Sequence, residues 1–343
     1  MLLVSAETMA GAAAQYNVDQ RKTSLGPNEL AVIVNDADPL SVKVAEYYKT
    51  RRQIPGINMV HVNFQAGQAM MKAGEFQSVK KVVDAATPRN VQAFVLTWTI
   101  PYRVECMSVT YAFAVGFDNR GYCTPECRPT KLSPYFNSSS RRPYDDYHIR
   151  PTMSLAGVNF AQVKALIDRG IASDYTYPEG VGYLVSTNDK ERNVRAALYP
   201  EIIQRLSGVV DLRLVKADLI INRKKIMYYF TGAVKVRALD SLQFLPGAIA
   251  DHLTSTGGQL TDSDQMSSLR WLEAGATGSY GTVSEPCNFL AKFPHPGIVM
   301  SFYSQGESLI EAYWKSVAWP SQGIFIGEPL AAPFARRIES RGL

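Results

Sequence analysis

The sequence lacks the features that mark several large classes of protein. No stretch of its 343 residues approaches the roughly 20 consecutive apolar residues that a membrane-spanning helix needs. Basic residues are scattered and the formal net charge is only +5, so no nucleic-acid-binding surface is indicated. The first 17 residues contain no basic residue and carry Glu7 inside their only apolar stretch, which is atypical of a secretion signal.

Familiar catalytic motifs are also missing. The chain contains no GxxxxGK[ST] phosphate loop, no GxGxxG after its first expected strand, no HExxH and no GxSxG. The common phosphate-binding, dinucleotide-binding, zinc-protease and serine-hydrolase interpretations therefore lose support. Histidine is scarce and dispersed, at His61, His148, His252 and His295, so no metal cluster is evident from the sequence.

The four cysteines are Cys106, Cys123, Cys127 and Cys287. An even number with three members clustered suits one or two disulfides in an oxidising compartment, with unpaired thiols as the alternative. The C-x3-C spacing of Cys123 and Cys127 is a weak zinc signal, because no second Cys/His pair stands at a suitable spacing.

The remaining pattern is that of an α/β protein. Hydrophobic residues make up 46% of the chain and charged residues 20%, values that suit either one large domain or two packed lobes. Residues 1–30 read as an extended N-terminal arm, and 31–335 as the α/β domain. Strands expected at 31–34, 59–64 and 91–98 alternate with helices at 41–52 and 76–85. This alternation predicts a mostly parallel, doubly wound sheet flanked by helices, as in flavodoxin-like proteins.

The alternation is interrupted by a long insertion at 106–153, which is rich in Pro, Ser, Arg and Tyr and suits a binding loop or a surface arm. Beyond it we expect strands at 182–187, 211–217, 226–230 and 324–326. Helices are expected at 159–172, 190–206, about 247–254, 267–274 and 303–319. The glycines of the run 277–283 imply close backbone packing.

Polar residues follow several of the expected strands. If the strand tips line a cleft, its candidate residues are Asn35, Asp36, Asp38, Thr99, Asp189, Thr231 and Glu285. The alternative is that such residues cap the helices that follow the strands.

Two kinds of chemistry could use these groups. Cys287 and His252 are the most plausible nucleophile and base, although a disulfide for Cys287 and a structural hydrogen bond for His252 are the alternatives. The carboxylates of Asp36, Asp38, Asp189 and Glu285 could hold calcium or magnesium. No other cofactor is indicated.

Several blocks resemble a bacterial family of conserved hypothetical proteins that has no established activity. They include VIVNDADPLSVKVAEYYKTRRQIP at 32–55, VQAFVLTWTIPYRVECMSVTYAFAVGFD at 91–118, PGAIADHLTSTGG at 246–258 and LEAGATGSYGTVSEPCNFLAKFPHP at 272–296. Because members of that family usually look exported, the resemblance implies an extracytoplasmic protein with disulfides.

More remotely, the order of elements is similar to the caspase-like sheet of gingipain-type cysteine peptidases, with FVLTWTIP at 94–101 resembling their central strand. Their hallmark strand ends in His-Gly, where this chain has Thr231-Gly232. Their nucleophilic cysteine follows the next element, where PGAIADHLTSTGG has no cysteine. The resemblance therefore implies a non-catalytic binding, surface or assembly protein whose partner is itself or another protein. The alternative is a hydrolase that uses Cys287 and His252, or a metal held by the carboxylates.

Overall fold

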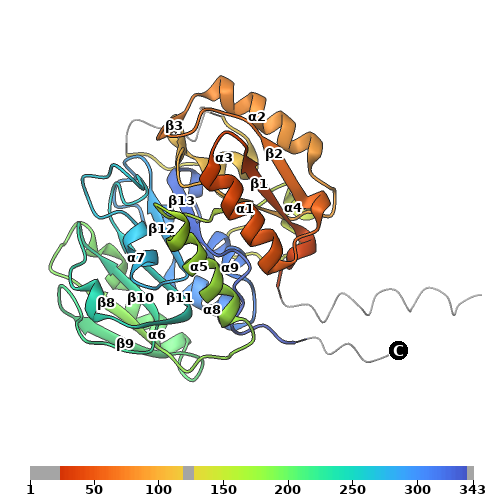
Figure 1. The fold of residues 1–343 in the computed structure, drawn as a ribbon. Helices are drawn as coiled ribbons and strands as arrows, with labels where there is room; N and C mark the ends of the chain where they lie inside the picture. The colour runs from red at the N-terminus through yellow and green to blue at the C-terminus, as the bar shows by residue number, and fades with distance from the viewer. Residues whose placement is uncertain (1–23, 119–126, 338–343) are drawn as a thin grey trace, which may run out of the picture.

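The computed structural model describes residues 24–118 and 127–337. One sheet of ten strands runs through them, in the order β2-β1-β4-β7-β13-β12-β11-β10-β8-β9 (Figure 1). The strands are β1 (Leu30–Asn35), β2 (Met59–Val62), β4 (Ala93–Leu96), β7 (Thr152–Ser154), β8 (Val181–Ser186), β9 (Asp211–Lys216), β10 (Ile226–Gly232), β11 (Phe244–Leu253), β12 (Gly278–Thr282) and β13 (Gly323–Gly327). A small second sheet holds β3 (Met70–Met71), β5 (Arg103–Val104) and β6 (Met107–Ser108).

The strand pairing confirms the predicted fold class. All neighbours in the large sheet run parallel except β12 and β13, which pair antiparallel. Every residue of β1 is buried, as expected for a strand covered on both faces. The Asp38 carboxylate accepts the Leu40 N–H, and Pro39 occupies the first turn of the helix that follows. A polar residue after a strand therefore starts the next helix.

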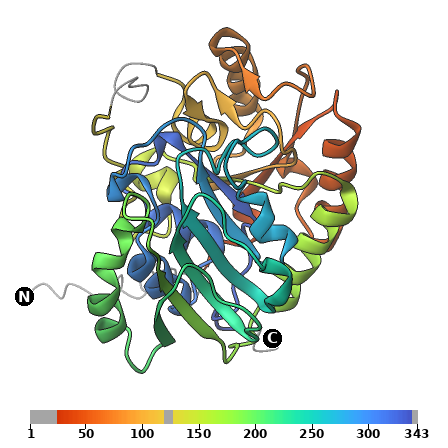
Figure 2. The same cartoon turned by 90° about the vertical axis from the view of Figure 1, so that its left-hand side faces the viewer.

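Helices cover both faces of the sheet. They are α1 (Pro39–Arg52), α2 (Ala73–Ala86), α3 (Val109–Val115), α4 (Pro143–Tyr147), α5 (Phe160–Ser173), α6 (Tyr199–Arg205), α7 (Leu269–Glu273), α8 (Pro296–Ser304) and α9 (Leu309–Lys315). In Figure 2, α1, α5 and α7 lie along one side of the sheet and α6, α8 and α9 along the other. Contacts of α1 with α5, of α6 with α8 and of α8 with α9 agree with this view.

The sheet has two consecutive parts. The strands from 30 to 154 form the segment β2-β1-β4-β7, and those from 181 to 327 form β13-β12-β11-β10-β8-β9. The parts meet where Ser154 of β7 pairs with Ile326 of β13. We call them the N-terminal and C-terminal parts of the sheet.

Some predicted elements are wrong. The helix expected at about 247–254 lies mostly in the strand β11. Of the single helix expected at 303–319, only 309–315 forms a helix of its own, α9, while 303–304 are the last residues of α8. The helix expected at 190–206 begins as a 3-10 helix, η4 (Asn193–Leu198), before α6. The insertion at 106–153 is not irregular throughout, because it contains the helix α3, which is almost wholly buried. Most of the expected arm, 1–23, lies outside the described residues, as do Cys123 and its surroundings at 119–126.

A candidate binding pocket at the strand tips

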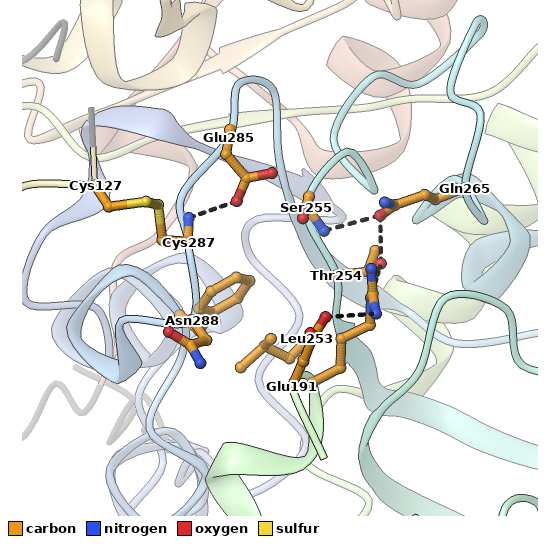
Figure 3. A pocket seen from close by; sticks show the side chains of 11 residues that line it. Cys127, Glu191, Leu253, Thr254, Ser255, Gln265, Glu285, Cys287 and Asn288 are labelled. Atoms are coloured by element: carbon orange, nitrogen blue, oxygen red, sulfur yellow. Dashed lines mark hydrogen bonds and ion pairs between the residues drawn. A yellow bond between two sulfur atoms is a disulfide. The ribbon is translucent and has the colours of Figure 1, made fainter. Parts of the chain in front are cut away.

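A pocket of about 460 Å³ opens beyond the carboxyl end of β11 (Figure 3). Apart from Cys127, its walls come from the end of β11 and the segments that follow β8, β11 and β12, at the carboxyl edge of the parallel strands, which is the usual place for ligands in α/β sheets. The lining residues are Cys127, Glu191, Arg192, Leu253, Thr254, Ser255, Gln265, Glu285, Cys287, Asn288 and Phe293.

The side-chain amide of Gln265 and the hydroxyl of Thr282 hold the loop after β11. The Gln265 Oε1 atom accepts the Ser255 N–H at 2.9 Å and the Thr256 N–H at 3.1 Å, and it also accepts the Thr254 hydroxyl. From below, the Thr282 hydroxyl donates to the carbonyls of Thr254 and Ser255, at 3.0 and 2.9 Å. The pocket floor is therefore fixed by hydrogen bonds before any ligand arrives.

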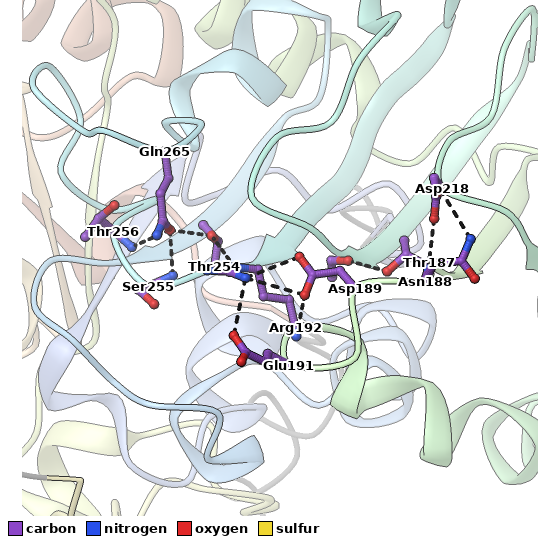
Figure 4. A network of polar contacts seen from close by, with 11 residues as sticks. Thr187, Asn188, Asp189, Glu191, Arg192, Asp218, Thr254, Ser255, Thr256 and Gln265 are labelled. Carbon is purple, nitrogen blue, oxygen red and sulfur yellow. Dashed lines mark hydrogen bonds and ion pairs between the residues drawn. The ribbon is translucent and has the colours of Figure 1, made fainter.

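Arg192 is a loosely held cation on the pocket wall (Figure 4). Its guanidinium lies 3.3 Å from Asp189, 3.8 Å from Glu191 and 3.4 Å from the Thr254 hydroxyl. These separations are long for charge-assisted hydrogen bonds, which are usually about 2.7–2.9 Å. Asp189, a predicted cleft residue, reaches the pocket only through Arg192.

A disulfide joins Cys127 to Cys287 on the pocket wall opposite Ser255 and Gln265 (Figure 3). The two residues are 160 positions apart and their Cα atoms are separated by 5.7 Å. The Cys287 N–H donates to the predicted cleft residue Glu285 at 2.6 Å, which fixes the turn beside the disulfide. Two of the predicted disulfide candidates, Cys127 and Cys106, are thus disulfide-bonded, and Cys287 takes the disulfide that was the alternative to its role as nucleophile.

His252 lies on β11, not on the helix where it was predicted. Its Nδ1 accepts the Trp271 indole N–H at 2.9 Å, and its Nε2 donates to the Met266 carbonyl at 3.0 Å. Burial lowers the pKa of His252 to about 3, so the ring is neutral at physiological pH. With both ring nitrogens engaged and Cys287 in a disulfide, the structure does not assemble them as a base and a nucleophile.

A buried ion pair lies beneath the pocket floor. Arg195 contacts Asp251 of β11 at 2.5 Å and donates to the Thr231 carbonyl of β10 at 2.6 Å. Burial raises the pKa of Asp251 to about 6, and Arg195 opposes that effect. Thr231 stands where the peptidases that the sequence resembles have a histidine. It is buried and does not line the pocket.

The remaining predicted cleft residues serve the N-terminal part of the sheet. Asn35 is buried and its side-chain oxygen accepts the Phe64 and Ala37 N–H groups, both at 3.2 Å. Asp36 pairs with His61 at 2.7 Å on the surface, and Asp38 caps α1. The Thr99 hydroxyl donates to the Gly157 carbonyl at 2.7 Å. These contacts match the alternative interpretation, in which polar residues after strands fix local structure.

The four predicted metal-binding carboxylates are not brought together. Six strands separate β1, which precedes Asp36 and Asp38, from β8, which precedes Asp189. Neighbouring strands lie ~4.8 Å apart, so the carboxyl ends of β1 and β8 are separated by roughly 30 Å. Within 24–118 and 127–337, no group of three or more His, Cys, Asp or Glu residues could hold a metal ion.

The sequence prediction missed Thr254, Ser255 and Gln265, which form the pocket floor. Thr254 and Ser255 directly follow β11, so recognising that strand would have placed them at a strand tip. Gln265 lies in an irregular segment and carries no sequence signal for its role.

No helix in the described part of the chain is long and apolar enough to cross a membrane. Comparison with protein-family models, curated proteins and solved structures finds no match to this chain.

Proposed function

We propose that the protein is an exported, caspase-like binding protein that holds an extended polypeptide segment in the strand-tip pocket without thiol catalysis. The observation that carries this proposal is the state of Cys287. The thiolate is the nucleophilic form of cysteine, and a sulfur bonded to Cys127 cannot provide it.

The position of the pocket supports a peptide ligand. In the gingipain-type peptidases that the sequence resembles, the catalytic histidine ends one strand and the nucleophile follows the next element. Here β10 ends in Thr231-Gly232, β11 pairs beside it in parallel, and the pocket opens directly after β11. The pocket therefore occupies the place that the resemblance assigns to a peptidase centre, with Thr254 and Ser255 where a cysteine is expected.

The lining of the pocket also suits a polypeptide. Gln265, Ser255 and Asn288 offer amide and hydroxyl groups of the kind that bind peptide backbone, while Leu253 and Phe293 offer apolar contact. A volume of about 460 Å³ accommodates side chains of an extended segment rather than a folded domain.

Export is supported by the disulfides, because such bonds persist mainly outside the reducing cytosol. The same compartment would keep Cys287 oxidised.

The test uses unfolded, fluorescein-labelled casein, reduced and carboxymethylated, as the polypeptide probe, with binding followed by fluorescence polarisation. Ser255→Trp fills the pocket and is expected to weaken binding by about tenfold or more. Ser78→Trp places the same bulk on the exposed face of α2 and is the matched control, expected to bind like the wild type.

The probe should also remain intact on a denaturing gel after incubation. Absence of saturable binding, or equal binding by Ser255→Trp and wild type, would contradict the proposal. Cleavage of the probe that disappears in Cys287→Ala would instead support the cysteine-hydrolase alternative.

A further inference from the structure

The outer edge of β9 ends the large sheet. All six residues of β9 pair in parallel with β8 on one side, and no described strand pairs with the other side (Figure 1). An exposed strand edge presents unpaired N–H and C=O groups that can pair with another chain.

A hydrogen bond just after β9 shows which backbone N–H and C=O groups of the strand point away from β8. The Ala217 N–H donates to the Ser186 carbonyl of β8 at 3.1 Å. Because backbone groups alternate in direction along a strand, those of Arg213 and Asp211 also face β8. The backbone groups of Leu212 and Leu214 therefore face outward, toward solvent.

The side chains along this edge are both charged and apolar. Asp211 and Arg213, two residues apart on one face, are more than half exposed and form an ion pair at 3.2 Å. Leu214 is exposed, and so are Val209 and Ile221, which lie just before and just after the strand. The edge thus offers backbone groups, the exposed charges of Asp211, Arg213 and Lys216, and apolar surface together.

We propose that two copies of this chain associate through β9, as antiparallel strands related by a two-fold axis normal to the sheet and centred on Leu212. In this register Leu212 bonds reciprocally with Leu212 of the second copy through its outward backbone groups. Asp211 lies opposite Arg213 of the second copy, on the same face of the joined sheet, and the two-fold axis generates the same pair again. The interface is therefore complementary to itself, as a two-fold contact must be.

Charge selects this register over its neighbours. Centring the axis on Arg213 would place two guanidiniums directly opposite each other, which is destabilising. Centring it on Leu214 would place Arg213 opposite Val215 and Leu212 opposite Lys216, so neither cation would face an acidic residue of the second copy. Of these three registers, only the one centred on Leu212 places the exposed carboxylate of Asp211 opposite the exposed guanidinium of Arg213 of the second copy.

Sedimentation velocity over a concentration series tests the proposal, with wild-type protein expected to show a monomer–dimer equilibrium. Asp211→Arg and Arg213→Asp each place like charges opposite one another and are expected to raise the dimer dissociation constant by about tenfold or more. The double variant Asp211→Arg/Arg213→Asp exchanges the two signs, restores both pairs and should recover dimerisation.

Two further variants separate association from folding. Arg270→Asp breaks an exposed ion pair with Glu273 on α7 and should leave the dimer unchanged. Leu214→Pro removes one outward N–H without touching the ladder to β8, so it should dissociate the dimer while keeping the circular dichroism spectrum. A wild-type monomer at all concentrations, or a double variant that fails to recover, would overturn the proposal.

Discussion

At the scale of single residues, the ionisable groups beneath the pocket support its shape. Arg195 and Asp251 are about 2% exposed and tie the ends of β10 and β11 to the segment that follows β8. His252 lies on the adjacent residue of β11 and holds Trp271 and the Met266 carbonyl on the opposite face. Removing one partner of such a buried pair leaves an uncompensated charge, so these residues fix the floor on which the pocket is built.

The stability of the protein should depend on pH through His252. The pKa of His252 is about 3 in the folded chain, whereas the ordinary value is 6.5. Below pH 6.5, His252 is therefore protonated in the unfolded chain but stays neutral in the folded chain. His252 therefore contributes stability that is complete above pH 6.5 and is lost as the pH falls toward 3, at about 1.4 kcal/mol per pH unit.

Urea unfolding of wild type and His252→Gln between about pH 7 and pH 5 measures this effect. The raised pKa of Asp251 acts in the opposite direction, but it is present in both proteins and cancels in the comparison. The advantage of wild type over the variant is expected to shrink as the pH falls. A difference that stays constant with pH would contradict the assignment of a neutral, buried ring.

At the scale of elements, glycines set how closely the loop after β11 approaches β12. A Cβ atom added to Gly281 would lie 2.5 Å from the Gly258 nitrogen and 2.5 Å from the Gly257 carbonyl carbon. Since both contacts are to backbone, no side-chain rotation can relieve them. This observation confirms the prediction that the glycines of 277–283 mark close backbone packing.

Gly281→Ala is expected to cost about 2–3 kcal/mol of folding free energy, because the added methyl group displaces the Gly257-Gly258 backbone. The control is Gly74→Ala on α2, where nothing lies within 4 Å of an added Cβ. That change should be neutral or stabilise by up to about 1 kcal/mol. Denaturant midpoints of the two variants give the comparison, and equal effects would contradict it.

The correctly predicted elements are those in which the hydrophobic pattern of the sequence matches the burial of the residues. The apolar runs of β1 and β4 are buried at every position, as their composition indicates. By contrast β11 contains Ala248, Ala250, Asp251 and His252, which favour other structures, and it forms a strand because tertiary contacts pair Asp251 with Arg195 and hydrogen-bond both nitrogens of His252. The helix predicted at 303–319 does not begin at 303, because α8 ends at Ser304 and Gly306 follows with a φ of 94°, which a helix does not accommodate.

At the scale of the whole molecule, a buried charge network ties the two parts of the sheet together. Arg52 at the end of α1 reaches Glu328, directly after β13, with its Nε 3.0 Å from Oε1 and a second contact from Nη2. Arg52 also contacts Asp174 after α5, and the Tyr48 hydroxyl donates to Glu328 at 2.6 Å. Glu328 is fully buried, so these side chains take the place of water around its carboxylate.

Arg52→Met should destabilise the protein by about 3–5 kcal/mol, because it leaves the Glu328 carboxylate buried without its cation. The neighbouring Arg51 pairs with Asp168 at 3.2 Å and donates to the Tyr47 hydroxyl at 3.3 Å, both near the surface, so Arg51→Met should cost less than about 1 kcal/mol. Thermal unfolding of both variants checks the prediction. Similar losses for the two variants would show that the network does not carry this stability.

Long-range arrangement is the part that the sequence could not predict. The parallel sheet follows from local alternation, but the join between Ser154 and Ile326 brings a strand from the middle of the chain against one near its C-terminal end. Likewise the partner of Cys127 is 160 residues away, and nothing in the local pattern selects Cys287. The predicted rim of acidic residues assumed that all strand tips converge, whereas a sheet of ten strands spreads them along its edge.

The most direct test of a pocket without thiol catalysis is thiol labelling of native, unreduced protein with a small electrophile near neutral pH, quantified for each cysteine by mass spectrometry. We expect Cys287 to stay unlabelled and to be recovered in a peptide linked to Cys127, becoming reactive only after reduction. Rapid labelling of Cys287 that His252→Ala slows would contradict this account and would reveal an active nucleophile.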